Sequence, residues 1–88
     1  MSQIFEPGQL VATPGVAEKF EPEYIAKCHE RHISGDWGDI DPHDVAVNLR
    51  ALENGARLMS VYTEGDKTLW VITEAARSST TCLLPEEY

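Results

Sequence analysis

The residue types best suited to chemistry gather near the middle of the chain. Cys28 and His32 are four residues apart and His29 lies between them, so a helix would bring one thiol and two imidazoles close together. Asp36 follows shortly afterwards and could add a carboxylate. Thiolate and imidazole are preferred zinc ligands, and a thiol beside an imidazole is the beginning of a nucleophilic site. The segment therefore raises two hypotheses, a metal centre and a cysteine nucleophile.

Both hypotheses lack partners in the sequence. Structural zinc takes four ligands in a recognisable spacing, and only Cys82, far along the chain, could complete such a set. A cysteine in the middle of a helix lacks the helix N-terminus that would make it reactive. We therefore predict a protein that is not an enzyme, with no catalytic residues, metal or cofactor. Cys28 and Cys82 are interpreted as small buried side chains in a reduced compartment, not as a disulfide.

A second candidate site is an acidic segment around a tryptophan. The chain has 15 Asp and Glu against 7 Lys and Arg, a net charge of -8, and no Lys or Arg lies between Arg31 and Arg50. The segment is not a calcium loop, because the twelfth residue counted from Asp36 is Val47, where a glutamate is needed. Tryptophan is enriched at binding hot spots, and carboxylates steer basic partners. The predicted partner-binding residues are Asp36, Trp37, Asp39, Asp41 and Asp44.

Two alternatives to this binding site stay open. Trp37 could pack beneath its own loop, because tryptophan is highly buried on average. The aspartates could equally form a solvated face that keeps the protein soluble, because protein surfaces are normally rich in charge.

Charge and hydropathy exclude several classes of function. The basic residues are spread singly along the chain, so no basic stripe offsets repulsion from a phosphate backbone, and direct nucleic-acid binding is not expected. No apolar run approaches the roughly 20 residues of a membrane span, and the first residues lack a signal-peptide pattern. These features predict a cytoplasmic protein without membrane contact, whose partner is a basic surface of a protein or nucleoprotein complex.

Three helices are expected, and each begins with proline after a residue that can precede a helix. The third is the clearest, because Asp41 can cap its N-terminus and Gly55 stands just past its end. The expected helices cover residues 14–20, 22–34 and 42–54. The first of them is short, so the sequence supports two or three helices.

Strands are expected after Gly55, where apolar residues begin to alternate with polar ones. The expected strands cover residues 58–63, 68–74 and 80–84, and the short apolar run at 9–12 is a candidate N-terminal strand. Arg77 and the hydroxyls after it suggest a polar turn, with anion binding as the alternative. The sequence thus predicts one α+β domain over residues 1–88, with residues 1–8 as a loose lead-in. Its helices would be followed by a three-stranded antiparallel β-meander, which the N-terminal strand could extend.

The chain as a whole resembles a family of short proteins encoded on bacterial plasmids, integrative elements and phages. The resemblance covers nearly the whole domain, although the family commonly has an aspartate at the position of Ala76. Its motifs are the segments at 8–15, 35–39, 70–75 and 83–88, together with Asn48, Ala51, Leu52, Gly55, Arg57 and Leu58. Some members are labelled as related to restriction or methylation, but this chain has no room for a methyltransferase fold.

The resemblance implies a protein that acts on the defence systems of its host or on maintenance of the element. Nuclease and CRISPR effector complexes present basic channels, which a folded polyanion can occupy without catalysis. The expected function is therefore a non-enzymatic acidic interaction module, an anti-CRISPR or anti-restriction inhibitor. The alternatives are a small metal-binding protein using Cys28, His29, His32 and an aspartate, and an accessory subunit of a restriction or plasmid-maintenance complex.

Overall fold

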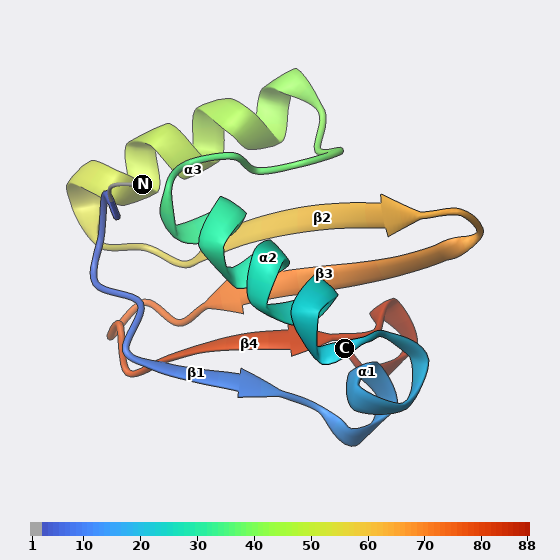
Figure 1. Cartoon of the computed structure of the whole chain (residues 1–88). Coiled ribbons are helices and arrows are strands. Elements are labelled where there is room, and N and C mark those ends of the chain that lie inside the picture. Colours follow the sequence, from blue (N-terminus) through green and yellow to red (C-terminus); the bar gives the residue numbers. More distant parts are fainter. Residues whose placement is uncertain (1–2) are drawn as a thin grey trace.

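Residues 3–88 are described by the computed structural model, in which the helices precede most of the sheet (Figure 1). The elements, in chain order, are β1 (Gln9–Ala12), α1 (Pro14–Lys19), α2 (Pro22–Ile33), α3 (Pro42–Asn54), β2 (Leu58–Glu64), β3 (Lys67–Thr73), β4 (Ser79–Leu83) and the 3-10 turn η1 (Pro85–Glu87). α2 crosses one face of the sheet, and α3 runs beside the outer strand β2.

The helix boundaries follow from local capping. The Thr13 hydroxyl accepts the N–H of Val16 at 3.3 Å at the start of α1. The Asp41 carboxylate accepts the N–H of Asp44 at 2.9 Å at the start of α3. Gly55 ends α3 in the left-handed conformation, with φ of 77°. The expected helices are confirmed, each with proline in its first turn.

The sheet has the order β1-β4-β3-β2. β2, β3 and β4 pair antiparallel as expected, but β1 pairs parallel with β4, with Gln9 opposite Ser79 and Ala12 opposite Cys82. The α+β class is therefore confirmed and the three antiparallel strands are present, but β1 joins them in parallel, so the sheet is four-stranded and mixed and not a pure antiparallel meander. The chain enters β1 at Gly8, where φ is 68° and a Cβ atom would collide with the carbonyl oxygen of Arg77.

Two apolar clusters hold the elements together. The larger one lies between the helices α1 and α2 and the sheet, and the smaller one lies beneath α3 and the loop before it. The larger cluster consists of Val16, Phe20, Cys28, Tyr62, Leu69, Val71, Cys82 and Leu84. The smaller cluster consists of Trp37, Ala51 and Leu58, with Phe5, Ile40, Val45 and Leu52 packed against them.

The expected loose lead-in at residues 1–8 lies partly outside the described residues. From residue 3 onwards the segment makes defined contacts. The N–H of Ile4 donates to the carbonyl oxygen of Ile33 at 2.8 Å, and the hydroxyl of Thr80 donates to the carbonyl oxygen of Pro7 at 2.7 Å. Phe5 stacks on Trp37 at 6.3 Å between ring centroids. Over residues 3–88, no helix has both the length and the apolar character needed to cross a membrane.

Candidate functional site

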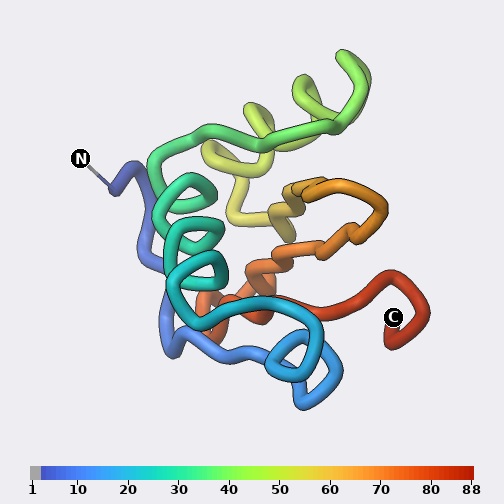
Figure 2. The backbone as a smooth tube through the Cα atoms, turned by 45° about the vertical axis from the view of Figure 1, so that its right-hand side comes forward, coloured from blue at the N-terminus to red at the C-terminus, as the bar shows by residue number. Residues whose placement is uncertain are grey.

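The acidic segment predicted from the sequence forms the connection from α2 to α3 and lines the outer edge of β2. Figure 2 shows it leaving the end of α2 and running beside α3 to the first turn of that helix. The N–H of Val61 donates to the carbonyl oxygen of Trp37 at 3.1 Å, and the N–H of Asp39 donates back to that of Val61 at 2.7 Å. These two bonds fix the backbone of the segment against the sheet.

Gly38 permits this close approach. Its φ is 74°, and a Cβ atom there would collide with the carbonyl oxygen of Val61 and lie 2.7 Å from the ring of Tyr62. A side chain would therefore push the loop off the strand. The absence of a side chain at Gly38 therefore lets the loop that carries Trp37 dock on the sheet.

Trp37 is buried, with 7% of its surface exposed. Its indole stacks on Phe5 at 6.3 Å and meets the imidazole of His32 edge-on at 5.6 Å. The indole is thus not at the surface, where a partner-binding role would place it, and it anchors the acidic segment from below. Phe5 lies far from Trp37 in the sequence, so the local motif carried no sign of this contact.

Asp36 is exposed but engaged. The guanidinium of Arg31 donates to both of its carboxylate oxygens, at 2.8 and 3.2 Å, and lies 4.5 Å over the ring of Tyr62. The hydrogen bond from Arg31 lowers the pKa of Asp36, and the bond from the N–H of Gly38 acts in the same direction. Asp36 therefore ties the loop to the end of α2, and its charge is already balanced.

The other three aspartates of the predicted site keep their charges uncompensated. Asp39, Asp41 and Asp44 are all exposed, and we call them the acidic ribbon. In the described part of the chain the ion pairs are Lys19–Glu86 and Arg31–Asp36, so neither involves the ribbon. Asp39 is held by its backbone bond to β2, and Asp41 is held as the cap of α3. The main chain that carries the ribbon is therefore held in place, and its three carboxylates are exposed to solvent.

A small cavity of about 210 Å³ adjoins the ribbon between α3 and β2. We call it the notch. Three of its lining side chains are apolar, namely Ile40, Val47 and Met59, and Val47 is 38% exposed. Asp44 of the ribbon and Arg57 also line the notch. No sequence pattern indicated it, because its walls come from a loop, a helix and a strand.

The Cys28, His29 and His32 set does not converge on a common point. His32 is fully buried, and its Nδ1 and Nε2 lie 2.5 Å from the hydroxyl of Ser60 and 2.9 Å from that of Thr73. Burial lowers the pKa of His32 to about 3, with a smaller contribution from the nearby His29. The imidazole is therefore neutral, and both of its nitrogens are occupied.

The donor and acceptor of each hydrogen bond in this buried network can be assigned from its last member, Thr80. The hydroxyl of Thr80 donates to the carbonyl oxygen of Pro7, so its oxygen accepts from Thr73 at 2.7 Å. Thr73 in turn accepts from Nε2–H of His32, which leaves Nδ1 to accept from the Ser60 hydroxyl. The network links α2 to β2, β3 and β4, and its role is structural. Only the position of His32 on the apolar stripe of its helix indicated burial in the sequence.

The two cysteines are free and buried, Cys28 on α2 and Cys82 on β4. Burial raises the pKa of Cys82 to about 12 and also raises the pKa of Cys28. The Cys82 sulfur lies 3.2 Å from Nε2 of His29, whose own pKa is lowered by burial. In residues 3–88 no group of three His, Cys, Asp or Glu side chains is placed to hold a metal.

Arg77, the candidate for anion binding, already donates its hydrogen bonds to main-chain carbonyl oxygens. Its guanidinium donates to the carbonyl oxygens of Ala51 at 3.1 Å and of Ala56 at 2.7 Å, at the C-terminal end of α3. Its backbone has φ of 58°, the left-handed conformation of a tight turn. The segment is therefore a turn, as the favoured interpretation of the sequence held, and its arginine also caps the C-terminal end of α3.

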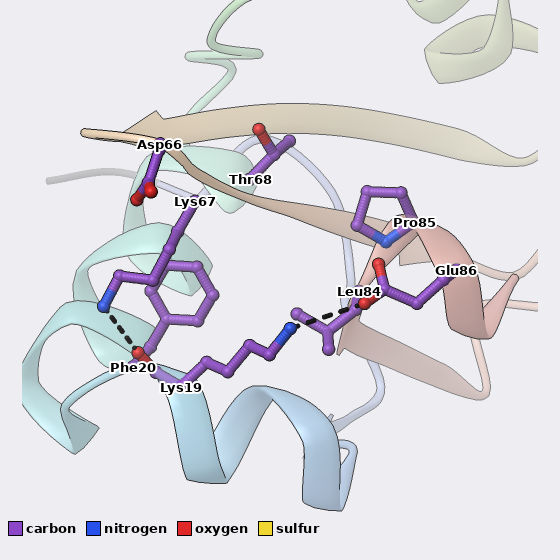
Figure 3. Close-up of a pocket in the computed structure, with 8 residues that line it drawn as sticks. All are labelled: Lys19, Phe20, Asp66, Lys67, Thr68, Leu84, Pro85 and Glu86. Atoms are coloured by element: carbon purple, nitrogen blue, oxygen red, sulfur yellow. Dashed lines mark hydrogen bonds and ion pairs between the residues drawn. The ribbon is translucent and has the colours of Figure 1, made fainter.

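A further cavity, of about 310 Å³, lies between α1, the β2–β3 turn and η1 (Figure 3). Lys67 donates to the carbonyl oxygen of Lys19 at 2.9 Å and lies 5.3 Å from the centroid of the Phe20 ring. Lys19 points the other way and pairs with Glu86 at 3.5 Å. Both ammonium groups therefore have partners. Their contacts link α1 to β3 and to η1 around the cavity.

Comparisons of the chain with protein-family models, with curated proteins and with solved structures found no match.

Proposed function

We propose that this chain is a non-enzymatic interaction module of a mobile genetic element that binds a basic surface through its acidic ribbon and the adjoining notch. The target would be a protein or nucleoprotein complex of host defence, such as a CRISPR effector or a restriction enzyme. Its basic channel would accept the carboxylates where phosphates otherwise lie.

The observation that carries the proposal is the placement of Asp39, Asp41 and Asp44 at or near a cavity with a partly apolar lining. Exposed, uncompensated carboxylates attract a basic surface and orient it during encounter. A partly apolar cavity at the same place can receive one side chain of the partner, because binding energy concentrates in a few buried anchors. The notch thus takes the anchoring role that the sequence had suggested for the indole of Trp37.

The groups that could react are otherwise occupied, which supports a module without catalysis. Both nitrogens of His32 are hydrogen-bonded inside the core. The thiols of Cys28 and Cys82 are buried and have raised pKa values, so they are poor nucleophiles. The resemblance to mobile-element proteins supplies the biological context.

Affinity capture from a bacterial lysate with charge-matched variants tests the proposal. One variant carries Asp39→Asn, Asp41→Asn and Asp44→Asn, and the asparagine introduced at position 41 can still cap α3. The control carries Glu23→Gln, Glu53→Gln and Glu74→Gln, which remove the same charge from exposed positions elsewhere. We expect the control to recover the wild-type partner and the ribbon variant to lose it. Equal recovery by both variants would reject the ribbon as the binding site.

The alternative, an accessory subunit of a restriction or plasmid-maintenance complex, differs from the proposed inhibitor only in the identity of the partner. A captured restriction or partition protein encoded beside this chain would support that alternative, whereas a host effector would support inhibition.

A further inference from the structure

One edge of the sheet is covered by other parts of the chain, and the other edge is open. At the β2 edge, the side chain of Asn48 bonds to the main chain of Met59, and the acidic segment bonds to Val61. These contacts block further strand pairing. β1 forms the opposite edge, and no element of the described chain pairs with its outer side (Figure 1).

The register shows which groups of β1 are available. Gln9 and Thr13 donate their N–H groups to carbonyl oxygens at the β4 side, those of Ser78 at 3.1 Å and Cys82 at 3.0 Å. Alternate residues of a strand direct their main-chain groups to opposite sides. The N–H and C=O groups of Leu10 and Ala12 therefore point outwards, away from β4.

An apolar groove of about 380 Å³ runs beside this open edge, between β1 and the helices. Leu10 and Ala12 line it from the strand, and Ala17, Pro22, Ile25 and Ala26 line it from α1 and α2. Leu10 is 48% exposed, so its side chain adds to an apolar surface that solvent reaches. An added strand would direct alternate side chains into this groove.

The charges around the groove identify its occupant. Glu18 follows Ala17 in α1, Glu21 precedes Pro22, and Glu30 stands one turn after Ala26 on α2; all three glutamates are exposed, as is the cation Lys27 beside Ala26. None belongs to an ion pair of the described chain. A second copy would bring a further net charge of -8 to the same edge, whereas a basic segment would be attracted to it.

We infer that β1 is a docking edge for an extended basic segment of a partner protein, which pairs with Leu10 and Ala12 as a fifth strand. Its apolar side chains, at alternate positions, would fill the groove, and Lys or Arg residues before and after the paired stretch would face the glutamates of α1 and α2. This surface lies at the opposite edge of the sheet from the acidic ribbon, so the inference goes beyond the function proposed above. An experiment can reject either proposal without affecting the other.

Titration of the isotope-labelled full chain with a synthetic peptide of alternating valine and threonine, flanked by lysines, tests the inference. The control is the same peptide with alternate main-chain amides methylated, which keeps its charge but cannot form the ladder. We expect NMR shift changes and slowed amide exchange at Leu10 and Ala12, with about tenfold weaker binding of the methylated peptide. Equal binding of both peptides, or shift changes confined to residues 36–44, would overturn the inference.

Two variants at one position make the site assignment sharper. Leu10→Pro removes the outward N–H while leaving the bonds of Gln9 and Thr13 to β4 in place, and Leu10→Lys keeps the N–H but places a cation in the groove. Both should weaken peptide binding about tenfold, whereas Leu49→Ala, at another exposed leucine, should not. Unchanged binding by a folded Leu10→Lys variant would contradict the docking edge. Concentration-dependent dimers that Leu10→Lys abolishes would assign the edge to a second copy and also overturn the inference.

Discussion

The side chain of Asn48 takes the place of a neighbouring strand at Met59. Its Nδ2 donates to the carbonyl oxygen of Met59 at 2.8 Å, and its Oδ1 accepts the N–H of Met59 at 3.2 Å. Asn48 is 3% exposed, so this amide closes the edge of the sheet inside the protein. The same residue lines the notch, and the contact therefore holds α3 and the acidic ribbon in a fixed position relative to β2.

Replacement of Asn48 should destabilise the protein. Asn48→Ala leaves the partly buried N–H and C=O groups of Met59 without their partner, which should lower the free energy of unfolding by about 1–3 kcal/mol. Urea denaturation followed by circular dichroism measures the change. Leu49→Ala, at the next position and 55% exposed, should cost less than about 0.5 kcal/mol. Similar losses in the two variants would show that the Asn48–Met59 contact contributes little.

Two left-handed glycines should differ in their tolerance of alanine. Gly55 has φ of 77° and open space around it, so Gly55→Ala should cost about 1 kcal/mol for the backbone conformation alone. Gly38 has φ of 74° but lies against Val61 and Tyr62, so Gly38→Ala should cost about 3 kcal/mol or more. Denaturation gives both values, and faster exchange of the Val61 amide in Gly38→Ala would report the loss of the docked loop. Equal costs would contradict the close approach.

The buried imidazole should make stability depend on pH. The pKa of His32 is lowered to about 3 in the folded protein, so between about pH 3 and pH 6.5 the unfolded chain binds a proton that the folded chain does not. The free energy of unfolding should therefore be greatest above about pH 6.5 and fall as the pH is lowered through that window. The full shift corresponds to at most about 5 kcal/mol. His29, whose pKa is lowered by burial, acts in the same direction.

Variants at two histidines separate this effect from general acid denaturation. His32→Gln should flatten the pH dependence of the unfolding free energy above about pH 4, whereas His43→Gln, at an exposed histidine, should leave it unchanged. A wild-type slope retained in His32→Gln would show that other groups cause the dependence.

The native thiols should be inert. Cys28 and Cys82 are 1% and 0% exposed, and burial raises the pKa values of both. A thiol reagent at about pH 8 should label neither cysteine in the native protein and both in urea. Ser78→Cys provides an exposed thiol as a positive control. Rapid labelling of native Cys28 or Cys82 would contradict their place in the core.

Local sequence signals predicted the helices well. The features that the sequence did not predict depend on contacts between residues far apart in the chain. Capping by Asp41 and termination at Gly55 depend on neighbouring residues, so α3 could be placed from the sequence alone. The parallel pairing of β1 with β4 joins residues about 70 positions apart, beyond the reach of any local pattern. The burial of Trp37 likewise depends on Phe5 and on His32 of another element.

The candidate site was partly accessible from the sequence for the same reason. Asp39, Asp41 and Asp44 are exposed because an acidic loop leading into a helix favours solvent, and their positions could be predicted. The pairing of Asp36 with Arg31 and the notch beside the ribbon depend on how α2, α3 and β2 meet. These features became visible only in three dimensions.

The rate of association with the captured partner tests the central claim most directly. Stopped-flow or surface measurements over a range of salt concentrations would compare the wild-type protein with the ribbon variant and with the charge-matched control. The ribbon variant should associate about tenfold more slowly at low salt and show a flatter salt dependence, while the control stays close to wild type. The same rate and salt dependence in both variants would mean that Asp39, Asp41 and Asp44 contribute only to overall charge, and that the binding site lies elsewhere.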